Sequence, residues 1–361
     1  MNCGFELVLA MDCEYLSVVF ALLLVGVQVG FTYDVKSFIT WDDMKVDLPR
    51  ERISTRDDGC RVIVVDKNGG GDSVTVQGAV DMVPASNTQR VKIFVLPGIY
   101  REKVLVPRSK PYISFIGEES RVADTIITWH DKASDIDING HKLGTANSAS
   151  VTIESDYFCA TGITFQNTVK AVAGASEMQA AALRIYGDRV MFYKVRVLGT
   201  QDTLLDLAGT HYFYQCHIEG NVDFIAGNGK SLYQECNLHS VAESSGAIAA
   251  QQRFSPDQNT GFSFVNCQVT GTGNILLGRP WGNFSRMIYS NCYFNNIIDP
   301  QGWSDWRDPK RQKYVILGEY ACRGPGADRG GRVSWSKSLS YEDAKPFLNT
   351  NFINGEQWLK L

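Results

Sequence analysis

The sequence of 361 residues predicts an all-β protein, a solenoid of the parallel β-helix type. Three observations lead to this fold class. A short apolar strand pattern recurs about every 20 residues, turn residues follow each copy, and the hairpin signals of other β folds are sparse. In a parallel β-helix each repeat forms one coil, and matching positions of neighbouring coils stack about 4.8 Å apart.

The repeat is clearest at one stacked position, which is always small or apolar. The residues at this position are Ile163, Val195, Cys216, Cys236, Cys267 and Cys292. Their spacings are 32, 21, 20, 31 and 25 residues, so the short spacings predict tight coils and the long ones predict loops. In solenoids such insertions often build the binding face. We expect the stacked position to point into the core. The alternative, a β-sandwich, would need strands every 8–12 residues joined by hairpin turns.

The flanks of the repeat predict further elements of the same solenoid. The expected elements are strands over 62–65, 91–98 and 113–117, a helix over 74–83 with Asp72 or Ser73 as its N-cap, and a helical and looped tail over 341–361. We expect the helix to cover the open end of the solenoid, because the backbone edge there would otherwise be exposed. The tail is expected to pack back along the coils.

The amino-terminal region predicts a signal peptide over residues 1–30, because its apolar run of 15 residues, 16–30, is short for a membrane span. The segment before this run holds acidic residues and no Lys or Arg, so an uncleaved anchor or a misassigned start remains an alternative. Residues 31–57 then form an N-terminal extension, and 58–361 form the β-helix domain.

Charge and cysteine content exclude several classes of protein. The chain carries −4, and residues 1–30 contribute −3 of it through Glu6, Asp12 and Glu14, which leaves −1 on the remainder. Such a near-neutral body argues against nucleic acid as a partner. Seven cysteines follow residue 30, an odd number, so at least one thiol should stay free. No C-x-x-C occurs, and we expect no metal site and no cofactor.

Two aspartates, Asp202 and Asp223, each follow the stacked apolar position by seven residues. Stacking therefore places two carboxylates side by side on consecutive coils. Gln179 precedes Gln201 by 22 residues, again about one coil, which adds two amides. The turn 277–281 adds a guanidinium, Arg279, and an indole, Trp281.

Each of these residues has a structural alternative, because Asp and Gln often stabilise solenoid turns and an Arg can be a plain surface charge. Together they form a carboxylate pair with amide donors, a fixed cation and an aromatic platform. His211 and His217 lie on a predicted strand and show no metal spacing, so we expect structural roles for them.

The chain resembles the plant pectin methylesterases, or pectinesterases. The segments that carry the resemblance are 98–102, 179–184, 199–204, 222–225, 277–281 and 302–306. It extends from about residue 58 to the C-terminus and implies the branch without the inhibitory pro-domain. It further implies a right-handed, pectin-lyase-like β-helix that hydrolyses the C6 methyl esters of homogalacturonan. From it we expect a secreted monomer in the cell wall, with a proteinaceous pectinesterase inhibitor as a candidate partner and no membrane contact in the mature form.

By this resemblance Asp223 is the nucleophile on the ester carbonyl, and Asp202 is first the general acid and then the base. Arg279 would hold Asp223 ionised, because a nearby cation lowers a carboxyl pKa. Two adjacent carboxylates do not both ionise easily, which separates acid from nucleophile. Gln179 and Gln201 would donate hydrogen bonds to the tetrahedral oxyanion. The residues expected to contact the sugar are Trp281, Ser150 and Trp303.

The sequence also departs from the family pattern. Leu205, Ala226 and Leu276 replace residues that are often aromatic in the family, so we expect a wider cleft that binds galacturonate rings more weakly. Cys236 and Cys267 should stack on neighbouring coils, and the family often bridges this pair. We therefore expect a disulfide there, with Cys216–Cys236 as the alternative.

Two other functions remain open at this point. A pectic glycosidase on the same fold would also use paired carboxylates, although an inverting one needs them roughly 6.5–9.5 Å apart. A non-catalytic protein that binds wall polysaccharide would need none of the reacting groups.

Overall fold

The structure is a computed structural model that describes residues 38–46, 61–170 and 175–361. The predicted signal peptide over 1–30, much of the extension over 31–57, and Cys60 lie outside the described residues. The described residues belong to one compact unit, Phe38–Leu361.

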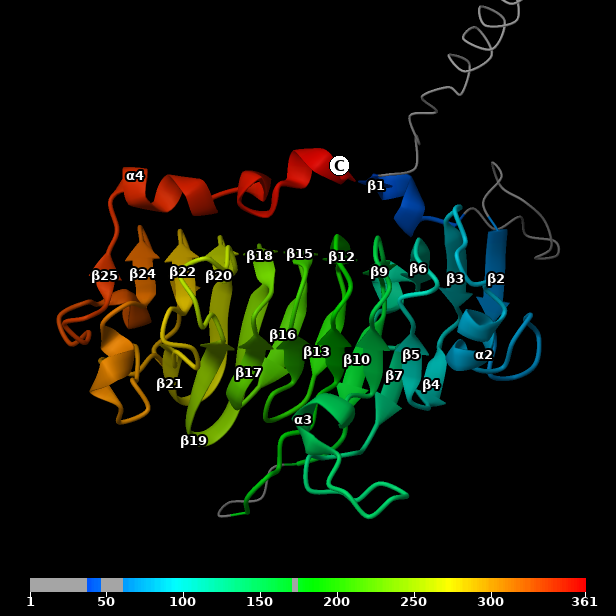
Figure 1. The fold of residues 1–361 in the computed structure, drawn as a ribbon, viewed down its shortest axis with the longest axis horizontal. Helices are drawn as coiled ribbons and strands as arrows, with labels where there is room; N and C mark the ends of the chain where they lie inside the picture. Colours follow the sequence, from blue (N-terminus) through cyan, green and yellow to red (C-terminus); the bar gives the residue numbers. More distant parts are fainter. Residues whose placement is uncertain (1–37, 47–60, 171–174) are drawn as a thin grey trace, which may run out of the picture. The chain divides into compact units, whose positions relative to one another are not determined.

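Two long sheets of parallel strands build this unit (Figure 1). The eleven-stranded sheet runs in the order β2 (Arg61–Val65), β3 (Val91–Val95), β6 (Ile113–Ile116), β9 (Cys159–Thr161), β12 (Val190–Tyr193), β15 (Thr210–Tyr214), β18 (Lys230–Gln234), β20 (Gly261–Val265), β22 (Arg286–Ser290), β24 (Ile316–Tyr320) and β25 (Lys337–Ser338). We call it the first face.

The thirteen-stranded sheet supplies two faces, because it folds back at the long strand β19 (Asn237–Gln251). The second face holds β4 (Gly98–Arg101), β7 (Thr125–Trp129), β10 (Thr164–Asn167), β13 (Arg196–Leu198), β16 (His217–Gly220), the first part of β19 and of β21 (Gln268–Gly278), and β23 (Tyr293–Phe294). The third face holds β5 (Val104–Val106), β8 (Val151–Ile153), β11 (Leu183–Ile185), β14 (Leu204–Asp206), β17 (Val222–Gly227) and the later parts of β19 and β21.

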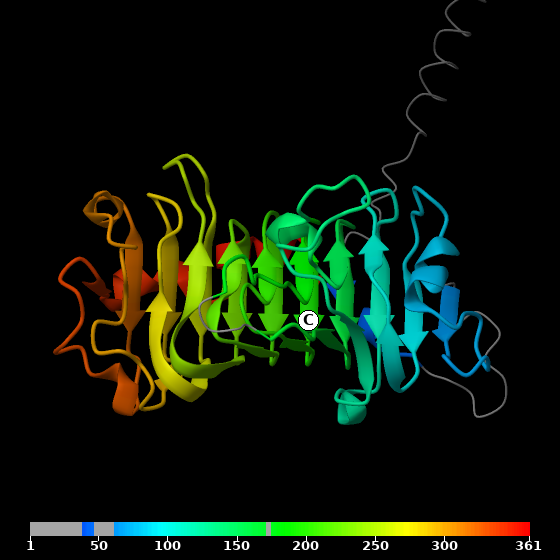
Figure 2. The same cartoon turned by 90° about the horizontal axis from the view of Figure 1, so that it is seen from below.

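The strand register confirms the predicted repeat. Val190 pairs with His211 on the first face and Leu204 with Ile225 on the third, both 21 residues apart. The coils from β3 to β21 thus take one strand from each face, and Figure 2 shows the strands of successive coils side by side. The chain is the parallel β-helix that the period predicts.

A sharp bend separates the first face from the second on each successive coil. The residue at the bend has a left-handed φ of 47° to 55° in Lys194, Gln215, Glu235, Asn266, Asn291 and Ala321. The next residue points inward and is buried from Val195 to Cys292, as expected. Cys322 extends the same column by one coil, which the sequence analysis did not assign.

The core is ordered by rings that stack from coil to coil. Phe192, Phe213, Tyr233, Phe264 and Tyr289 follow one another with centroid separations of 5.0, 4.5, 4.9 and 4.4 Å. Stacked aromatic pairs contribute about 0.5–1.5 kcal/mol each beyond the area that they bury. Because the coils share one register, the same inward position repeats the same contact.

The expected disulfide is wrong for this structure: Cys216, Cys236 and Cys267 are all free thiols. The Sγ of Cys236 donates to the carbonyl of Phe213 at 3.5 Å, and that of Cys267 donates to Tyr233 at 3.3 Å. The stacked thiols share one orientation, each toward a main-chain oxygen of the preceding coil. Burial raises the pKa of both the Cys236 and the Cys267 thiol well above the usual range.

Peptide mapping under non-reducing conditions tests this arrangement. We expect Cys236 and Cys267 to resist alkylation in the folded protein, because buried, protonated thiols are unreactive. Both should be fully alkylated after unfolding without reductant. A peptide pair linked through these two residues would contradict the structure.

Short helices close the remaining surfaces. They are η1 (Trp41–Met44), α2 (Val76–Asp81), η2 (Glu119–Arg121), α3 (Gly144–Asn147), η3 (Pro309–Gln312), η4 (Pro325–Ala327), α4 (Tyr341–Ala344), η5 (Lys345–Phe347), η6 (Thr350–Ile353) and η7 (Gly355–Gln357). The N-cap of α2 is Thr75, not the expected Asp72 or Ser73, and its hydroxyl accepts from the Gly78 amide. The buried residues of α2 join the main core beside β2 and β3, as predicted (Figure 1).

The carboxy-terminal tail packs along the first face, as expected (Figure 1). Ile353 and Trp358 are buried against outward side chains such as Met191 and Leu232. The last strand, β26 (Leu359–Lys360), pairs with β1 (Ile39–Thr40). The outer side of the first face is therefore covered, whereas the polar side chains of the second face remain outside.

Candidate active site

The two aspartates meet where the chain turns from the second face into the third. Gln201 pairs with Val222 in an isolated parallel bridge, and the Asp202 amide donates to the Val222 carbonyl at 3.2 Å. Asp202 and Asp223 therefore occupy neighbouring positions of consecutive coils, as the repeat predicts. Both have left-handed φ values, 56° and 48°. Asp tolerates this conformation better than most residues, and such backbone often marks functional sites.

Arg279 reaches Asp223 from two strands away. It follows the end of β21, whose Gly278 pairs with Ala249 on β19, and Ala249 in turn pairs with Ile225 on β17. The Arg279 Nε donates to Asp223 Oδ1 at 2.9 Å, and its Nη2 donates to Oδ2. This is a bidentate pair, the strongest common geometry between a guanidinium and a carboxylate. Asp223 is 5% exposed, so water competes little with it.

Burial and charge give the two carboxyls different proton affinities. Burial raises the pKa of Asp202 to about 8, the negative charge of Asp223 adds to the rise, and Arg279 opposes it. Burial also raises the pKa of Asp223, while the hydrogen bonds and charge of Arg279 oppose that rise. Arg279 thus acts in the expected direction, but burial outweighs it. Since the guanidinium bonds directly to Asp223, we take Asp223 to ionise before Asp202.

The two glutamines come from adjacent coils, one period apart. The Ala180 amide donates to the Gln201 carbonyl at 3.1 Å, the same pattern in which the Asp202 amide donates to Val222 beside the Gln201–Val222 bridge, so Gln179 stands opposite Gln201. The Oε1 of Gln179 is buried and has no hydrogen-bond partner within the described residues. The Gln179 carbonyl accepts from Ala133 at 2.8 Å, which ties its loop to the insertion that carries α3. Two inserted segments of the chain therefore meet at Gln179.

The aromatic residues are only partly as expected. Trp281 is 40% exposed, so it can contact a ligand. Trp303 is fully buried and packs edge-on against Tyr289 at 5.9 Å, so its expected contact with sugar is wrong. Trp306 occupies the exposed position instead, and the Arg279 guanidinium lies 3.9 Å from its ring centroid. The motif over 302–306 contains both Trp303 and Trp306, and the local sequence does not distinguish which of them faces the core.

Ser150 is also not placed as expected. Its side chain is fully buried, and its hydroxyl donates to the Gln166 carbonyl at 2.8 Å. It therefore stabilises the turn between the second and third faces and does not present a hydroxyl to a ligand.

The expected widening of the cleft by Leu205 and Ala226 is wrong as well. Their side chains are 2% and 1% exposed and belong to a small apolar cluster with Ala181 and Ala250. Leu276 is half-buried. The aliphatic residues of this cluster pack against each other on neighbouring strands of the third face.

A buried network that no local sequence pattern predicts holds the end of β14. The Asp206 carboxylate accepts from Tyr233 at 2.5 Å and lies 2.5 Å from His211 Nδ1. All three side chains are fully buried. His211 is structural, as expected, and Asp206 fixes the strand that begins two residues after Asp202.

A pocket of about 580 Å³ opens beside the aspartates, at the bend between the second and third faces. Thr200 and Asn221 line it, and each lies two residues before one of the aspartates. The volume lies within the usual range for small-molecule sites.

Comparison with known proteins decides the family. The sequence model of the pectinesterase family matches residues 62–356. The chain belongs to the pectinesterase family. This pectinesterase is 60% identical over 355 residues to Pectinesterase QRT1 of Arabidopsis thaliana, and the match covers 93% of each of the two chains. It is 39% identical over 311 residues to Pectinesterase 31 of the same plant, covering 83% of this chain and 96% of the relative.

Solved structures agree with the fold. Pectin methylesterase from carrot superposes with a TM-score of 0.76 at 34% identity, covering 84% of this chain and 96% of that one. The enzyme from Aspergillus niger gives 0.71 at 28% identity, covering 85% and 98%. This pectinesterase is therefore a right-handed parallel β-helix and a carboxylic ester hydrolase that acts on pectin of the plant cell wall. In the part of the chain that the structure describes, no helix has the length and apolarity to cross a membrane.

Proposed function

We propose that this pectinesterase hydrolyses the C6 methyl esters of homogalacturonan through an acyl-enzyme on Asp223. The observation that carries the proposal is the pair of stacked carboxyls, of which Arg279 binds one while the other, Asp202, has a pKa of about 8. Near neutral pH such a pair holds one nucleophile and one acid. A wall-binding protein without activity would need neither state.

The first half-reaction forms the acyl-enzyme and releases methanol. The ionised Asp223 carboxylate attacks the ester carbonyl, and the negative charge moves to the carbonyl oxygen. The amide groups of Gln179 and Gln201 donate hydrogen bonds to this oxygen; one such donor typically contributes ~3 kcal/mol. Asp202 gives its proton to the departing methoxide, which leaves as methanol. The acyl group stays on Asp223 as an anhydride.

The second half-reaction restores the enzyme. Asp202, now ionised, takes a proton from a water molecule, whose oxygen attacks the sugar carbonyl of the anhydride. The bond to Asp223 breaks, and the galacturonate acid is released. Arg279 remains bonded to Asp223 and favours its departure as a carboxylate.

Methanol release from methylated pectin, measured beside the appearance of reducing ends, tests this function. We expect methanol without new reducing ends. New reducing ends would indicate a pectic glycosidase, and binding without either product would indicate a non-catalytic wall protein.

We further propose that the two exposed indoles near Arg279, Trp281 and Trp306, contact the sugar rings. Replacing Trp306 by Ala should raise KM several-fold on methylated oligogalacturonides, because the sugar loses a flat apolar contact whose worth we take to be similar to that of an aromatic pair, about 0.5–1.5 kcal/mol. Replacing the buried Trp303 by Ala should instead lower the free energy of unfolding by about 3–5 kcal/mol. Steady-state kinetics and thermal unfolding of both variants separate these effects. A raised KM for Trp303→Ala at unchanged stability would contradict the assignment.

We also propose that the protein is secreted through residues 1–30 and works as a monomer in the cell wall, with a proteinaceous pectinesterase inhibitor as a candidate partner. Secretion is tested by whether the full chain, but not a chain lacking residues 1–30, reaches the cell wall, and gel filtration of the purified protein, alone and with such an inhibitor, tests the monomer and the inhibitor contact.

A further inference from the structure

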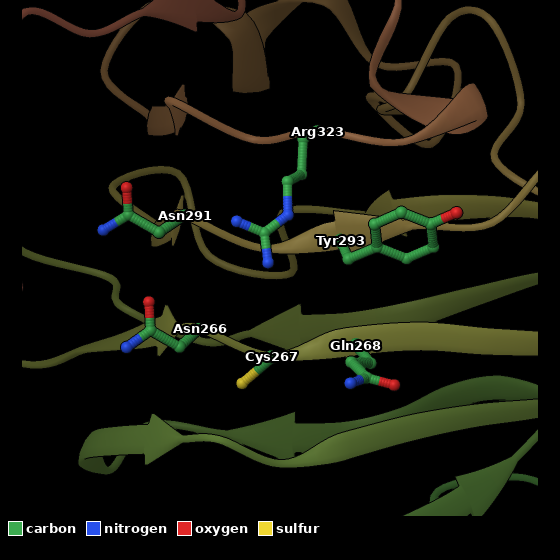
Figure 3. A pocket seen from close by; sticks show the side chains of 6 residues that line it. All are labelled: Asn266, Cys267, Gln268, Asn291, Tyr293 and Arg323. Atoms are coloured by element: carbon green, nitrogen blue, oxygen red, sulfur yellow. The ribbon is translucent and has the colours of Figure 1, made fainter.

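A second pocket lies away from the aspartates, at the bend between the first and second faces (Figure 3). Its volume is about 360 Å³, within the usual range for small-molecule sites. Its lining residues are Asn266, Cys267, Gln268, Asn291, Tyr293 and Arg323. The aspartates occupy the other bend, between the second and third faces, so this pocket is separate from the catalytic groups.

The coil repeat builds this pocket from two rows of outward polar residues. Gln268 pairs with Tyr293, and Tyr293 pairs with Arg323, so these three residues stand on consecutive coils. Asn266 and Asn291 form the second row at the bend, both with a φ of 55°. Figure 3 shows the Arg323 side chain between those of Asn291 and Tyr293, with Gln268 and Asn266 on the next coil.

The polar side chains of the pocket are not used inside the protein. The five polar lining residues are those other than Cys267. Among the described residues, none of these five makes a side-chain hydrogen bond or ion pair. By contrast, Asn237, the preceding residue in the row of Gln268, bonds to His217 at 3.2 Å and to Thr270 at 2.8 Å. The Arg323 guanidinium is thus an exposed cation without a carboxylate partner in the described part of a chain whose net charge is −4.

Tyr293 gives the pocket a positioned aromatic ring. The ring is 38% exposed, and Gly324 lies against its edge, where an added Cβ would be 3.0 Å from Cε2. Gly324 also has a φ of 98°, so a side chain there would be strained. The glycine therefore lets the chain pass close to the ring and limits its movement.

We infer that this pocket binds a galacturonate unit of demethylesterified pectin through its free carboxylate. The inference rests on the proposed function, whose product carries one such carboxylate for every ester removed. Arg323 pairs with the carboxylate, the Tyr293 ring contacts the apolar side of the sugar, and the three amides bond to hydroxyls. A methyl ester has no charge and cannot form this ion pair, so the pocket selects product over substrate.

Binding of product at a second place would hold the enzyme on stretches that it has already demethylesterified. Effective concentration would then favour new attack nearby on the same polymer. Because the ion pair is exposed, added salt should weaken this retention.

Hydrogen exchange with mass spectrometry tests the inference on the full chain, using the Asp223→Asn variant to prevent turnover. A demethylesterified hexagalacturonate should protect peptides that contain residues 266–268, 291–294 and 321–324, besides those around Asp202. The fully methylated hexamer should protect only the peptides around the aspartates. Arg323→Gln should weaken the protection of the second pocket about tenfold, the ratio expected for one charge-assisted hydrogen bond.

Arg61→Gln is the matched control, since it removes the same charge from an exposed residue on β2. It should change neither protection pattern. Arg323→Gln should also leave kcat on a short methylated oligomer unchanged while it raises KM on long, partly methylated pectin.

Three outcomes would overturn the inference: no protection of the second pocket by the demethylesterified hexamer, equal protection by the methylated one, or equal protection by sulfate at matched ionic strength. If methanol release itself were absent from the wild type, the proposed function would fail instead, so the two failures are distinguishable.

Discussion

Asp223→Asn is expected to abolish methanol release, with kcat lowered at least about 10⁴-fold, the order seen when a catalytic nucleophile is removed. The amide keeps the shape of the side chain and can still accept one hydrogen bond from Arg279, but it cannot form the anhydride. The measurement is methanol released from methylated pectin at saturating substrate. Circular dichroism and the unfolding midpoint should show that the fold is retained.

Asp124→Asn is the matched control for this variant. Asp124 is an exposed carboxylate whose partner is Arg121, on a coil remote in sequence from the site. The same chemical change there should leave kcat unchanged. If Asp223→Asn kept more than a few per cent of the wild-type rate, the nucleophile would have to be another group.

The pH dependence of the reaction should report the proton on Asp202. Its pKa of about 8 lies far above the usual value for an aspartate, so the carboxyl keeps its proton at neutral pH and loses it as the pH rises through about 8. Because methoxide leaves with that proton, we expect kcat/KM to fall about tenfold per pH unit on the alkaline side. Asp202→Asn should be severely impaired at every pH and should lack this alkaline limb. An unchanged limb in the variant would assign the titration to another residue.

The same shift gives a stability prediction whose sign can be derived. The unfolded Asp202 titrates near 3.8, and the folded one near 8, so between these values the folded protein binds one more proton. The free energy of unfolding contributed by Asp202 therefore falls as the pH rises through this window. Asp202→Asn removes that loss, so the stability of the variant relative to wild type should increase from pH ~4 to pH ~8. Urea unfolding at several pH values measures it, and a relative stability that decreased over the window would contradict the raised pKa.

The sequence alone determined the fold and the juxtaposition of the two aspartates for a clear physical reason. A coil must return to the same position after each turn, so a spacing of 21 residues converts directly into neighbours in space. This rule stacked Asp202 on Asp223, as the Gln201–Val222 bridge confirms. A solenoid also leaves its first coil and its outer surface open, and the sequence predicted that α2 and the carboxy-terminal tail cover them.

Only the tertiary structure decided which individual side chains point into the core and which are exposed. Trp303 and Trp306 differ in environment because only one of them faces the core beside Tyr289, which no local pattern reveals. Leu205 and Ala226 are buried by neighbours from other coils, so substitution of aromatic residues there does not open a cleft. The repeat gives the position of a residue along the solenoid. The orientation of its side chain and its exposure to water depend on packing with loops whose lengths are irregular.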